Sequence, residues 1–407
     1  MLLKLALSNI LLNRRRTIIT IALSAFSAAF FIFYIGLLKG SFTKMYKDQS
    51  ELYLGYIQVT GAGYLDDPSN ENLIFNEKEV LSKIKQNPDV EFVSSRFESF
   101  ALYASSENAF GAQFTAVQPS LEQKMTNMSK HIYKGRYLQD DDTTGIVLGS
   151  GLAKRLEVDV GGKLSVITTA ADYSFAAENL YVVGILKTHV PELDNNLVFM
   201  NKGHFDTFME SENIATHIIA KPKDTKKSLS ITSDLNKTLD DSSLHIEDWH
   251  TFMSHMIQLE QMKIQGGATT ISLFILLIFF VVLIYTFLAV QSRIKEIGIM
   301  RAIGTKPSQI LRVLLYETFI LAVVSVIIGG IVGGYLTYYF NINPIYLSSV
   351  EEMYREYGIL DAHLPTEFEW NYVFIGTAYV FVLNLISIIY PAWTVIRIRP
   401  IDAINHI

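Results

Sequence analysis

The sequence predicts a membrane protein with four transmembrane α-helices and a large α/β extracytoplasmic domain inserted between the first and second spans. Half of the 407 residues are apolar and only 18% are charged, and the mean hydropathy is +0.26, values that are unusual for a soluble chain. Four charge-free apolar windows are each long enough to cross a bilayer core of about 30 Å as a helix. A long polar segment separates the first two windows.

The four windows define the spans. The predicted transmembrane helices cover residues 17–38, 264–292, 318–340 and 370–396. The first follows three arginines, as the apolar part of a secretory signal would, and small residues lie at 27–29. Because uncharged residues continue beyond them to Leu38, we predict an anchor that is not cleaved.

The distribution of Lys and Arg predicts the orientation of the spans. The connecting segments are an N-terminal segment 1–16, a domain 39–263, a loop 293–317, a second loop 341–369 and a tail 397–407. Basic residues outnumber acidic ones in the N-terminal segment, the first loop and the tail, whereas the second loop holds one Arg355 among several acids. By the positive-inside rule both termini and the first loop are predicted to be cytoplasmic.

The segment 39–263 alternates strand and helix patterns, as a compact α/β domain does. Predicted strands lie at 57–60, 91–95, 113–117, 146–148, 164–167, 181–186, 197–200 and 217–220, and predicted helices at 76–86, 149–156, 201–209 and 223–239. Asn76 and the Glu three residues later predict a capping-box-like helix start. Residues 39–54 and 248–265 continue as helical patterns out of the first two spans, and they form either a stalk that transmits motion or two linkers.

The same residues exclude several classes of function. The net charge of -6 argues against nucleic-acid binding, which needs a clustered basic face. The chain has no cysteine, so disulfides, thiol catalysis and Cys-ligated zinc are excluded. No phosphate-binding G-x-x-x-x-G-K-[ST] loop and no H-E-x-x-H motif occurs, and His250 and His255 have the wrong spacing for a helical zinc pair. We predict no catalytic residue, no metal site and no cofactor in this chain itself.

A short amphipathic helix is predicted in the loop 293–317. Its polar and small residues are Arg293, Lys295, Glu296, Gly298, Arg301 and Gly304. Gly304 fits a helix C-terminus, and Pro307 fits the start of the next helix. The helix either docks on a partner protein or anchors the loop in the lipid headgroups.

Two further features are singled out by their residue types. Tyr173 and Phe175 lie near the tip of the loop 168–180 and form either a contact site or a part of the domain surface that folds back on itself. Gly329, Gly330, Gly333 and Gly334 place two small-xxx-small pairs on the third span, which favours close helix contact.

The stretch KEIGIMRAIG at 295–304 resembles the signature of the FtsX-like permease family, the membrane subunits of ABC transporters. The ending, YPAW at 390–393 and RPIDAI at 399–404, is similar to the close of that family. Within the domain, the stretches 145–156, 160–162, 183–186 and 193–200 look most like the lipoprotein-releasing subunits of the LolC/LolE type, and the chain also resembles MacB-type permeases.

The resemblance implies a function. The helix at 293–304 would couple to a separate ABC ATP-binding subunit that holds ATP and Mg, and a second permease subunit, either the same chain or a paralogue, would complete the assembly. Such a complex lies in the bacterial inner membrane among membrane lipids and extracts lipoproteins for transfer toward the outer membrane. The stripe of Phe26, Phe30, Phe33 and Leu37 would line an acyl-chain cavity, with helix packing as the alternative.

The sequence leaves the carrier-docking site, the cargo and a non-transporting function open. In the lipoprotein-releasing branch a periplasmic carrier docks on an outer-domain loop, and the loop 168–180 occupies that position but is short and lacks proline, so a second subunit is the alternative docking site. The cargo could instead be a peptide, toxin or drug passed to an export duct. A non-transporting regulator of cell-wall hydrolases is the third hypothesis.

Overall fold

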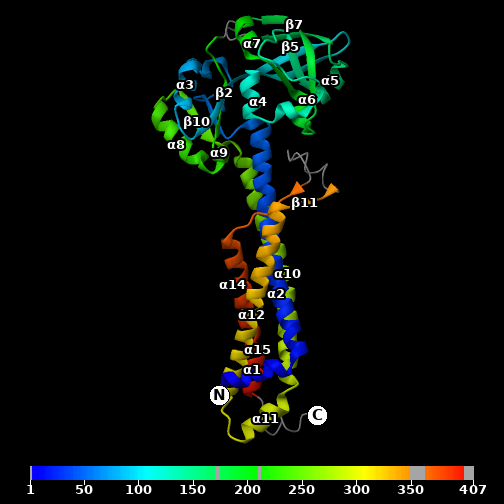
Figure 1. The fold of residues 1–407 in the computed structure, drawn as a ribbon, viewed down its shortest axis with the longest axis vertical. Coiled ribbons are helices and arrows are strands. Elements are labelled where there is room, and N and C mark those ends of the chain that lie inside the picture. The colour runs from blue at the N-terminus through cyan, green and yellow to red at the C-terminus, as the bar shows by residue number, and fades with distance from the viewer. Residues whose placement is uncertain (1, 170–174, 210–211, 349–362, 398–407) are drawn as a thin grey trace. The chain divides into compact units, whose positions relative to one another are not determined.

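The computed structural model describes residues 2–169, 175–209, 212–348 and 363–397, which form two compact units (Figure 1). The described residues up to 43, 259–346 and 363–397 make a helical unit. Residues 44–258 make an α/β unit.

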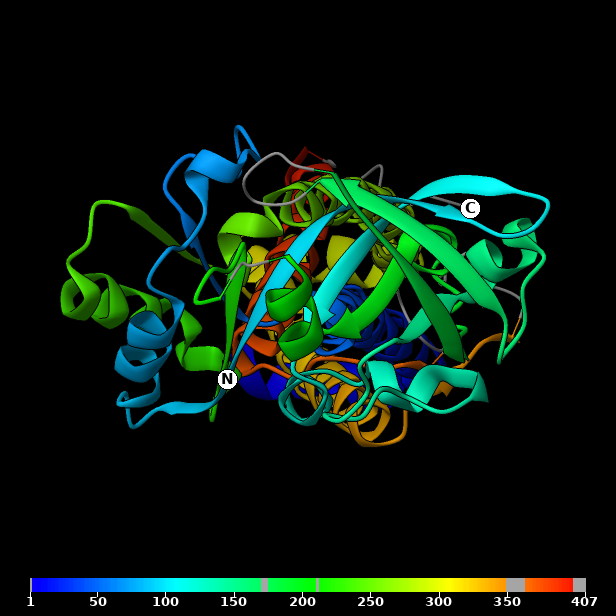
Figure 2. The same cartoon turned by 90° about the horizontal axis from the view of Figure 1, so that it is seen from above.

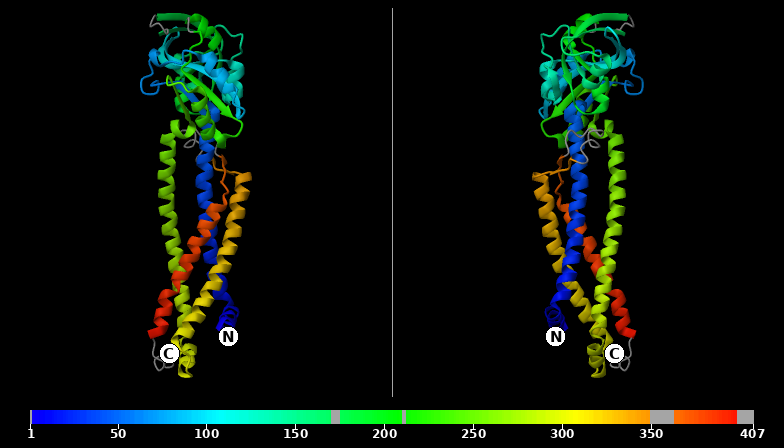
Figure 3. Two further views of the ribbon diagram at one scale, coloured as in Figure 1. Left: turned by 90° about the vertical axis from the view of Figure 1, so that its left-hand side faces the viewer. Right: turned by 90° about the vertical axis from the view of Figure 1, so that its right-hand side faces the viewer.

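Within the described residues, four helices are long and apolar enough to cross a membrane. They are α2 (Arg14–Gln49), α10 (Ser254–Gln291), α12 (Pro307–Ile342) and α14 (Trp370–Ser387), the last continued by α15 (Ile389–Arg397). Two shorter helices, α1 (Leu2–Leu12) and α11 (Ile294–Ala302), lie at one end of the long helices (Figure 3). A small hairpin of β11 (Ile345–Tyr346) and β12 (His363–Leu364) completes the unit. The predicted fold class, four spans with an α/β domain between the first and the second, is confirmed.

Small residues set the distance between α2 and α12. A Cβ atom added to Gly329 would lie 2.6 Å from the carbonyl oxygen of Ala25, and one added to Gly333 would lie 2.7 Å from the Cα of Ala29. Only glycine lets the two backbones approach so closely. The close helix contact predicted from the small-xxx-small pairs is therefore confirmed.

The α/β unit is built on a ten-stranded sheet of order β10-β1-β9-β2-β3-β8-β5-β7-β4, in which β6 additionally pairs with β2 and β7 (Figure 2). The strands are β1 (Ile57–Gly61), β2 (Val90–Ala104), β3 (Ala109–Val117), β4 (Ile132–Gly135), β5 (Gly145–Gly149), β6 (Lys163–Thr169), β7 (Phe175–Leu186), β8 (Leu197–Asn201), β9 (His217–Pro222) and β10 (Leu244–Asp248). Only the β3–β8 and β5–β7 pairs are parallel. All eight predicted strands are found, whereas β4 and β10 were not predicted.

Strand β2 belongs to both halves of this sheet. Its first residues, from Val90 to Arg96, pair with β9, and its residues from Arg96 onward pair with β3. One apolar cluster includes Ile57, Val93 and Ile231 around β1, β9 and α8, and a second includes Phe114, Ile146 and Val198 around β3, β5 and β8. The long strand therefore joins two hydrophobic cores.

Short helices cover the sheet. They are α3 (Glu77–Lys85), α4 (Pro119–Met125), α5 (Ser150–Leu156), α6 (Pro191–Asn196), α7 (Lys202–Phe208), α8 (Ser228–Leu239) and α9 (Trp249–Phe252), with 3-10 turns at Asn70–Asn72, Met128–His131 and Thr225–Lys227. After α2 the chain continues as one π-helical turn, η1 (Ser50–Leu54). The four predicted helices are confirmed.

The predicted capping box at Asn76 is wrong. The Asn76 side chain makes no capping hydrogen bond. Instead, the backbone N–H of Lys78 donates to Oδ1 of Asn213 at 2.8 Å, and the N–H of Glu77 donates to the Asn213 carbonyl. A residue distant in sequence thus satisfies the free N–H groups of the first turn.

Candidate functional site: the segment around α11

The structure places the six residues predicted to couple to an ATPase on α11 and at its two ends. Arg293 lies at the N-cap position, and its Nε lies 3.3 Å from Oε2 of Glu296 in the first turn. Lys295 and Glu296 are exposed, Gly298 is buried and Arg301 is half-buried. Its exposed side carries Ile299 and Ile303 as well as Lys295 and Glu296, so the predicted amphipathic pattern is not found.

A glycine ends α11. Gly304 has a φ of 100°, in the left-handed region that favours glycine. The N–H of Thr305 donates to the carbonyl of Met300, and the N–H of Gly304 donates to that of Arg301. This bond pattern is a Schellman motif, and Pro307 then begins α12. Both boundaries predicted from the sequence are confirmed.

One face of α11 is fixed to the helical unit. Ile294, Ile297 and Gly298 are buried. Ile297 shares an apolar cluster with Val290 of α10, Ile310 and Leu314 of α12, Ala392 of α15, and Ile388 between α14 and α15. Packing on this side therefore fixes the position of α11 in the helical unit, while its other side is left for contacts with other molecules.

The other face of α11 is open in this chain. Ile299 is 56% exposed and Ile303 is 79% exposed, and Ile299 lies one helical turn from the exposed Lys295 and Glu296. Exposed large apolar side chains with charged neighbours are typical of a surface that is covered in a larger assembly.

Sequence reasoning missed Glu317. It lies in α12, is 3% exposed, and its Oε1 accepts a hydrogen bond from Nη2 of Arg16 at 2.9 Å. Nη1 of Arg293 lies 3.6 Å from the other carboxylate oxygen. The cluster joins α2, the start of α11 and α12. In the sequence, Glu317 is recognisable only as a single acidic residue at the end of the basic loop 293–317, before the third apolar window.

A cavity of about 380 Å³ lies beside this cluster. It is lined by Leu2, Leu5 and Asn9 of α1, by Arg16, Arg293 and Glu296, and by apolar side chains of α11 and α12. Helix α1 thus forms part of the same site, with Ala6 and Asn9 buried.

The residues of the predicted acyl-chain stripe do not all face the same neighbour. The stripe consists of Phe26, Phe30, Phe33 and Leu37. Phe26 is 54% exposed. The ring of Phe30 lies 4.9 Å from that of Phe274 in α10, and the ring of Phe33 lies 5.7 Å from that of Phe340 in α12. Leu37 is half-buried. A role of these residues in binding acyl chains stays a prediction.

Tyr173 lies outside the described residues, and Phe175 begins β7 without a described side chain, so their role stays a prediction. In the described part of the chain, no group of three or more His, Asp or Glu is placed to hold a metal ion.

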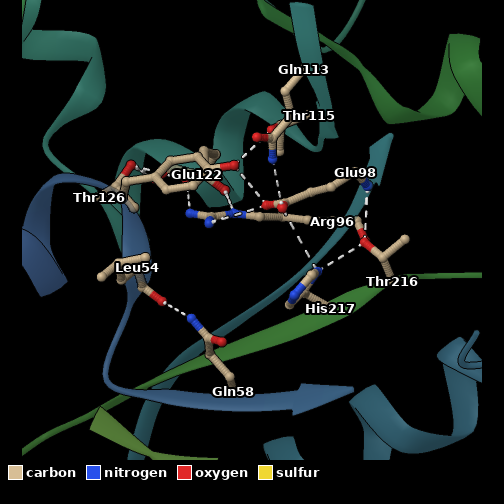
Figure 4. A network of polar contacts seen from close by, with 11 residues as sticks. Leu54, Gln58, Arg96, Glu98, Gln113, Thr115, Glu122, Thr126, Thr216 and His217 are labelled. Carbon is tan, nitrogen blue, oxygen red and sulfur yellow. Dashed lines mark hydrogen bonds and ion pairs between the residues drawn. The ribbon is translucent and has the colours of Figure 1, made fainter. Parts of the chain in front are cut away.

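A buried polar network lies inside the α/β unit, where η1 meets β2, β3 and α4 (Figure 4). Nη2 of Arg96 donates to Oε1 of Glu122 at 2.6 Å, and both side chains are almost fully buried. The hydroxyl of Tyr53 donates to Glu98 at 2.7 Å, and its ring lies 4.5 Å from the Arg96 guanidinium. Burial alone would lower the pKa of Arg96, but its pairing with Glu122 raises that pKa above its ordinary value. The network therefore holds η1 on the sheet through a permanently charged arginine.

Comparisons with known proteins agree with this arrangement. The family model described as FtsX-like permease C-terminal matches residues 268–400, and the model described as MacB-like periplasmic core domain matches residues 17–237, which is more than half of the chain. The chain belongs to the FtsX-like permeases with a MacB-like periplasmic core domain. It is thus a multi-pass membrane protein with an extracytoplasmic domain, and a subunit of the non-catalytic type in ABC transporters. This family implies a separate ATP-binding partner subunit.

Several relatives cover most of this permease. It is 24% identical to the lipoprotein-releasing system transmembrane protein LolC of Xylella fastidiosa, over 79% of each chain. It is 22% identical to LolE of Haemophilus influenzae over 85% of each chain. Among solved structures, the periplasmic region of MacB from Actinobacillus actinomycetemcomitans aligns with 52% of this chain and 97% of that one, at 12% identity and a TM-score of 0.39.

Proposed function

We propose that this permease is the membrane subunit of a lipoprotein-releasing ABC system, which extracts lipoproteins from the bacterial inner membrane for transfer toward the outer membrane. The observation that carries the proposal is the likeness to proteins named LolC and LolE, which runs through both the domain and the membrane helices. In this assignment both termini and α11 face the cytoplasm, where the basic residues of 1–16 and 293–317 lie.

The ATP-binding subunit docks on the exposed face of α11. Ile299 and Ile303 supply apolar contact, while Lys295, Glu296 and Arg301 supply charges. ATP and Mg bind in that partner, and closure of the partner moves α11. Because the inner face of α11 packs on α12 and α15, and Arg293 contacts Glu317, a displacement of α11 is passed on to the helices around it.

Helix α2 carries this motion to the domain. It is continuous from Arg14 to Gln49 and leads directly into η1. Tyr53 in η1 is held to the sheet by Glu98 and by stacking on Arg96. A stalk that ended in a mobile linker would lose the motion, whereas a hydrogen-bonded and packed end transmits it.

The cargo and the remaining partners follow from the same proposal. A second permease subunit, the same chain or a paralogue, pairs with this one, as two-fold symmetry favours. Acyl chains of the lipoprotein lie against Phe26, Phe30, Phe33 and Leu37, of which Phe26 is exposed. A periplasmic lipoprotein carrier docks at the loop that holds Tyr173 and Phe175.

Export of a peptide, toxin or drug is the second candidate function. It is favoured by the MacB-like periplasmic core model, which covers residues 17–237. The coupling through α11 would be the same, and only the cargo and the outer partner would differ.

Depletion of the chain in its own cells, followed by separation of inner and outer membranes, tests the proposal. We expect acylated lipoproteins to accumulate in the inner membrane. Purification in nanodiscs should recover an ATP-binding subunit together with acylated lipoproteins. Lipoproteins that still reach the outer membrane normally, together with recovery of an outer-membrane duct, would favour export instead.

The coupling step is tested by charge reversal on α11. Glu296→Lys combined with Arg301→Glu should prevent recovery of the ATP-binding subunit. The matched control swaps the exposed pair Asp234 and Lys237 on α8, which lie 3.8 Å apart, and should leave recovery unchanged. Equal recovery in both variants would refute docking at α11.

A further inference from the structure

Helix α1 exposes a row of leucines on the side that does not pack on the chain. Leu3, Leu7 and Leu11 are 52%, 43% and 66% exposed, and Leu12 is 78% exposed. Residues four positions apart lie on the same face of a helix, so Leu3, Leu7 and Leu11 form one continuous leucine stripe. The coupling proposed above uses α11 and α2 and leaves this stripe without a role.

Helix α1 is too short to cross a membrane. Its 11 residues extend about 16 Å, whereas a bilayer core is about 30 Å thick. Helix α2 begins at Arg14, directly after the bend at Asn13, and α1 runs across the direction of α2 (Figure 1). The hydroxyl of Thr17 donates to the carbonyl of Ile10 at 3.0 Å and so ties the two helices together across this bend. The position of α1 relative to the span is therefore fixed.

The bend places α1 at the edge of the bilayer. The apolar window of α2 begins at Thr17, three residues after Arg14, and this separation is about 5 Å along a helix. A helix held across the span at this level lies among the lipid headgroups, and its apolar side chains reach about 5–10 Å toward the acyl chains. The membrane that α2 enters is therefore the surface that covers the leucine stripe.

The charges around the leucine stripe indicate the class of lipid. Residues 1–16 contain four Lys or Arg and no Asp or Glu. Of these four, Arg16 pairs with Glu317. The other three, Lys4, Arg14 and Arg15, are exposed and form no ion pair within the described part of the chain. Because each unpaired cation near a membrane surface attracts anionic headgroups, this surface fits an anionic phospholipid better than a zwitterionic one.

We propose that α1 binds anionic phospholipids of the leaflet at which α2 begins. The leucine stripe lies at the boundary of the acyl chains, and Lys4, Arg14 and Arg15 contact the headgroup phosphates. Since α1 also lines the cavity beside α11, the lipid holds in place a helix that forms one wall of that cavity. The binding does not depend on whether the cargo is a lipoprotein.

The first test measures the depth of α1 with the full-length chain in nanodiscs. Because the chain has no cysteine, Leu7→Cys carries a nitroxide label at a single position. Phe319→Cys on α12, at a side chain that is 50% exposed within a span, is the control for contact with lipid. Asp234→Cys on α8, at an exposed position of the α/β unit, is the control for contact with water.

We expect the label at position 7 to collide with oxygen dissolved in the bilayer more often than with a water-soluble nickel complex, as the label at 319 does. A label at 7 that is as accessible to the nickel complex as the label at 234 would overturn the proposal. A label shielded from both reagents would also overturn it, because protein rather than lipid would then cover α1.

The second test compares photoactivatable analogues of anionic phosphatidylglycerol and zwitterionic phosphatidylcholine in the same nanodiscs. Mass spectrometry locates the adducts on the chain. We expect residues 2–16 to carry at least about fivefold more adducts from phosphatidylglycerol, the preference that one cation near a membrane surface supplies. Lys4→Gln combined with Arg14→Gln and Arg15→Gln should abolish this preference. Equal labelling of the unmodified chain by both analogues would refute the binding of anionic lipid.

The matched control for the triple variant removes three exposed lysines of the α/β unit, through Lys78→Gln, Lys124→Gln and Lys226→Gln, and should leave the preference unchanged. Because fewer cations before a span can alter its insertion, the triple variant is also made with Asp234→Cys. This cysteine should still react with a membrane-impermeant thiol reagent added outside spheroplasts. A correctly inserted triple variant that keeps the lipid preference would refute the role of the three cations.

Discussion

Glu317 Oε1 accepts a hydrogen bond from Arg16 Nη2 at 2.9 Å, although 301 positions separate the two residues in the sequence. The carboxylate is 3% exposed, and the guanidinium of Arg293 lies near its second oxygen. Two cations from different segments therefore share one buried anion. Removing that anion would leave the two arginines facing each other at the base of α11.

Glu317→Gln is expected to destabilise the helical unit by about 3 kcal/mol, because breaking a buried ion pair leaves unpaired charge behind. Unfolding of the nanodisc-reconstituted or micellar protein by denaturant measures the change. ATP hydrolysis by the reconstituted complex should fall as well. Glu296→Gln is the control, since the Glu296 side chain is 67% exposed, and its effect on unfolding should stay below about 1 kcal/mol. Equal effects would contradict the role assigned to Glu317.

Gly333→Ala and Gly266→Ala should change stability in opposite directions. An added Cβ at Gly333 would meet the Ala29 backbone at 2.7 Å, so α2 and α12 must separate, at a cost of about 1–3 kcal/mol. At Gly266 the same atom meets open space, and alanine should stabilise α10 by up to about 1 kcal/mol. Thermal unfolding of both variants in one detergent gives the comparison. A stabilised Gly333→Ala protein would refute the close contact.

Glu122→Gln should destabilise the α/β unit by about 3 kcal/mol, because Arg96 is 2% exposed and would lose its closest anion. Lys134→Met removes one partner of an ion pair of the same 2.6 Å length at the surface and should cost less than about 1 kcal/mol. Urea unfolding followed by the fluorescence of Trp249, which lies in this unit, distinguishes the two. Similar costs would show that burial does not determine the strength of the pair.

The free energy of unfolding of the α/β unit should decrease as the pH is lowered below about 6.5, in part because of His217. Burial lowers the pKa of His217, and Arg96 adds to this effect while Glu98 opposes it. The unfolded chain therefore binds a proton that the folded chain does not, and the free energy of unfolding falls by up to about 1.4 kcal/mol per pH unit as pH decreases. His217→Gln should flatten the curve between pH 7.5 and 5.

His245→Gln is the control for this titration, because the His245 side chain is 52% exposed. The comparison shows whether a changed slope is specific to the buried position 217. His131, whose pKa is also lowered by burial, leaves a residual slope in both variants. An unchanged slope in His217→Gln would exclude His217 as a contributor.

Local patterns in the sequence predicted the elements well. Charge-free windows predicted four spans, and alternation or short apolar runs predicted eight strands. Two strands of the ten-stranded sheet were missed for physical reasons: β4 is largely exposed, and β10 is a short, mostly polar strand at the edge of the sheet. The two-residue strands β11 and β12 were not predicted either. Strand β2 was predicted only as far as Ser95, whereas it continues to Ala104 and pairs with β3 from Arg96 onward.

The candidate site was predictable in part. The helical pattern and Gly304 predicted α11 and its end, since a left-handed residue is a local requirement, whereas the predicted amphipathicity of α11 is not found. Glu317 was not recognised, because its importance depends on Arg16 and Arg293 meeting it in space. The Phe26 to Leu37 stripe was predicted as one surface, whereas Phe30 and Phe33 contact two different helices.

The sequence by itself determined the number of spans, the insertion of an α/β domain after the first, and the short helix between the second and third. These features follow from hydrophobicity, periodicity and single turn residues, all of which act over a few positions. Only the tertiary structure decided which charges share Glu317, that Asn213 rather than Asn76 caps α3, and that Arg96 pairs with Glu122 inside the α/β unit. Each of these depends on residues brought together from distant segments, and pairing of that kind is not encoded in any local pattern.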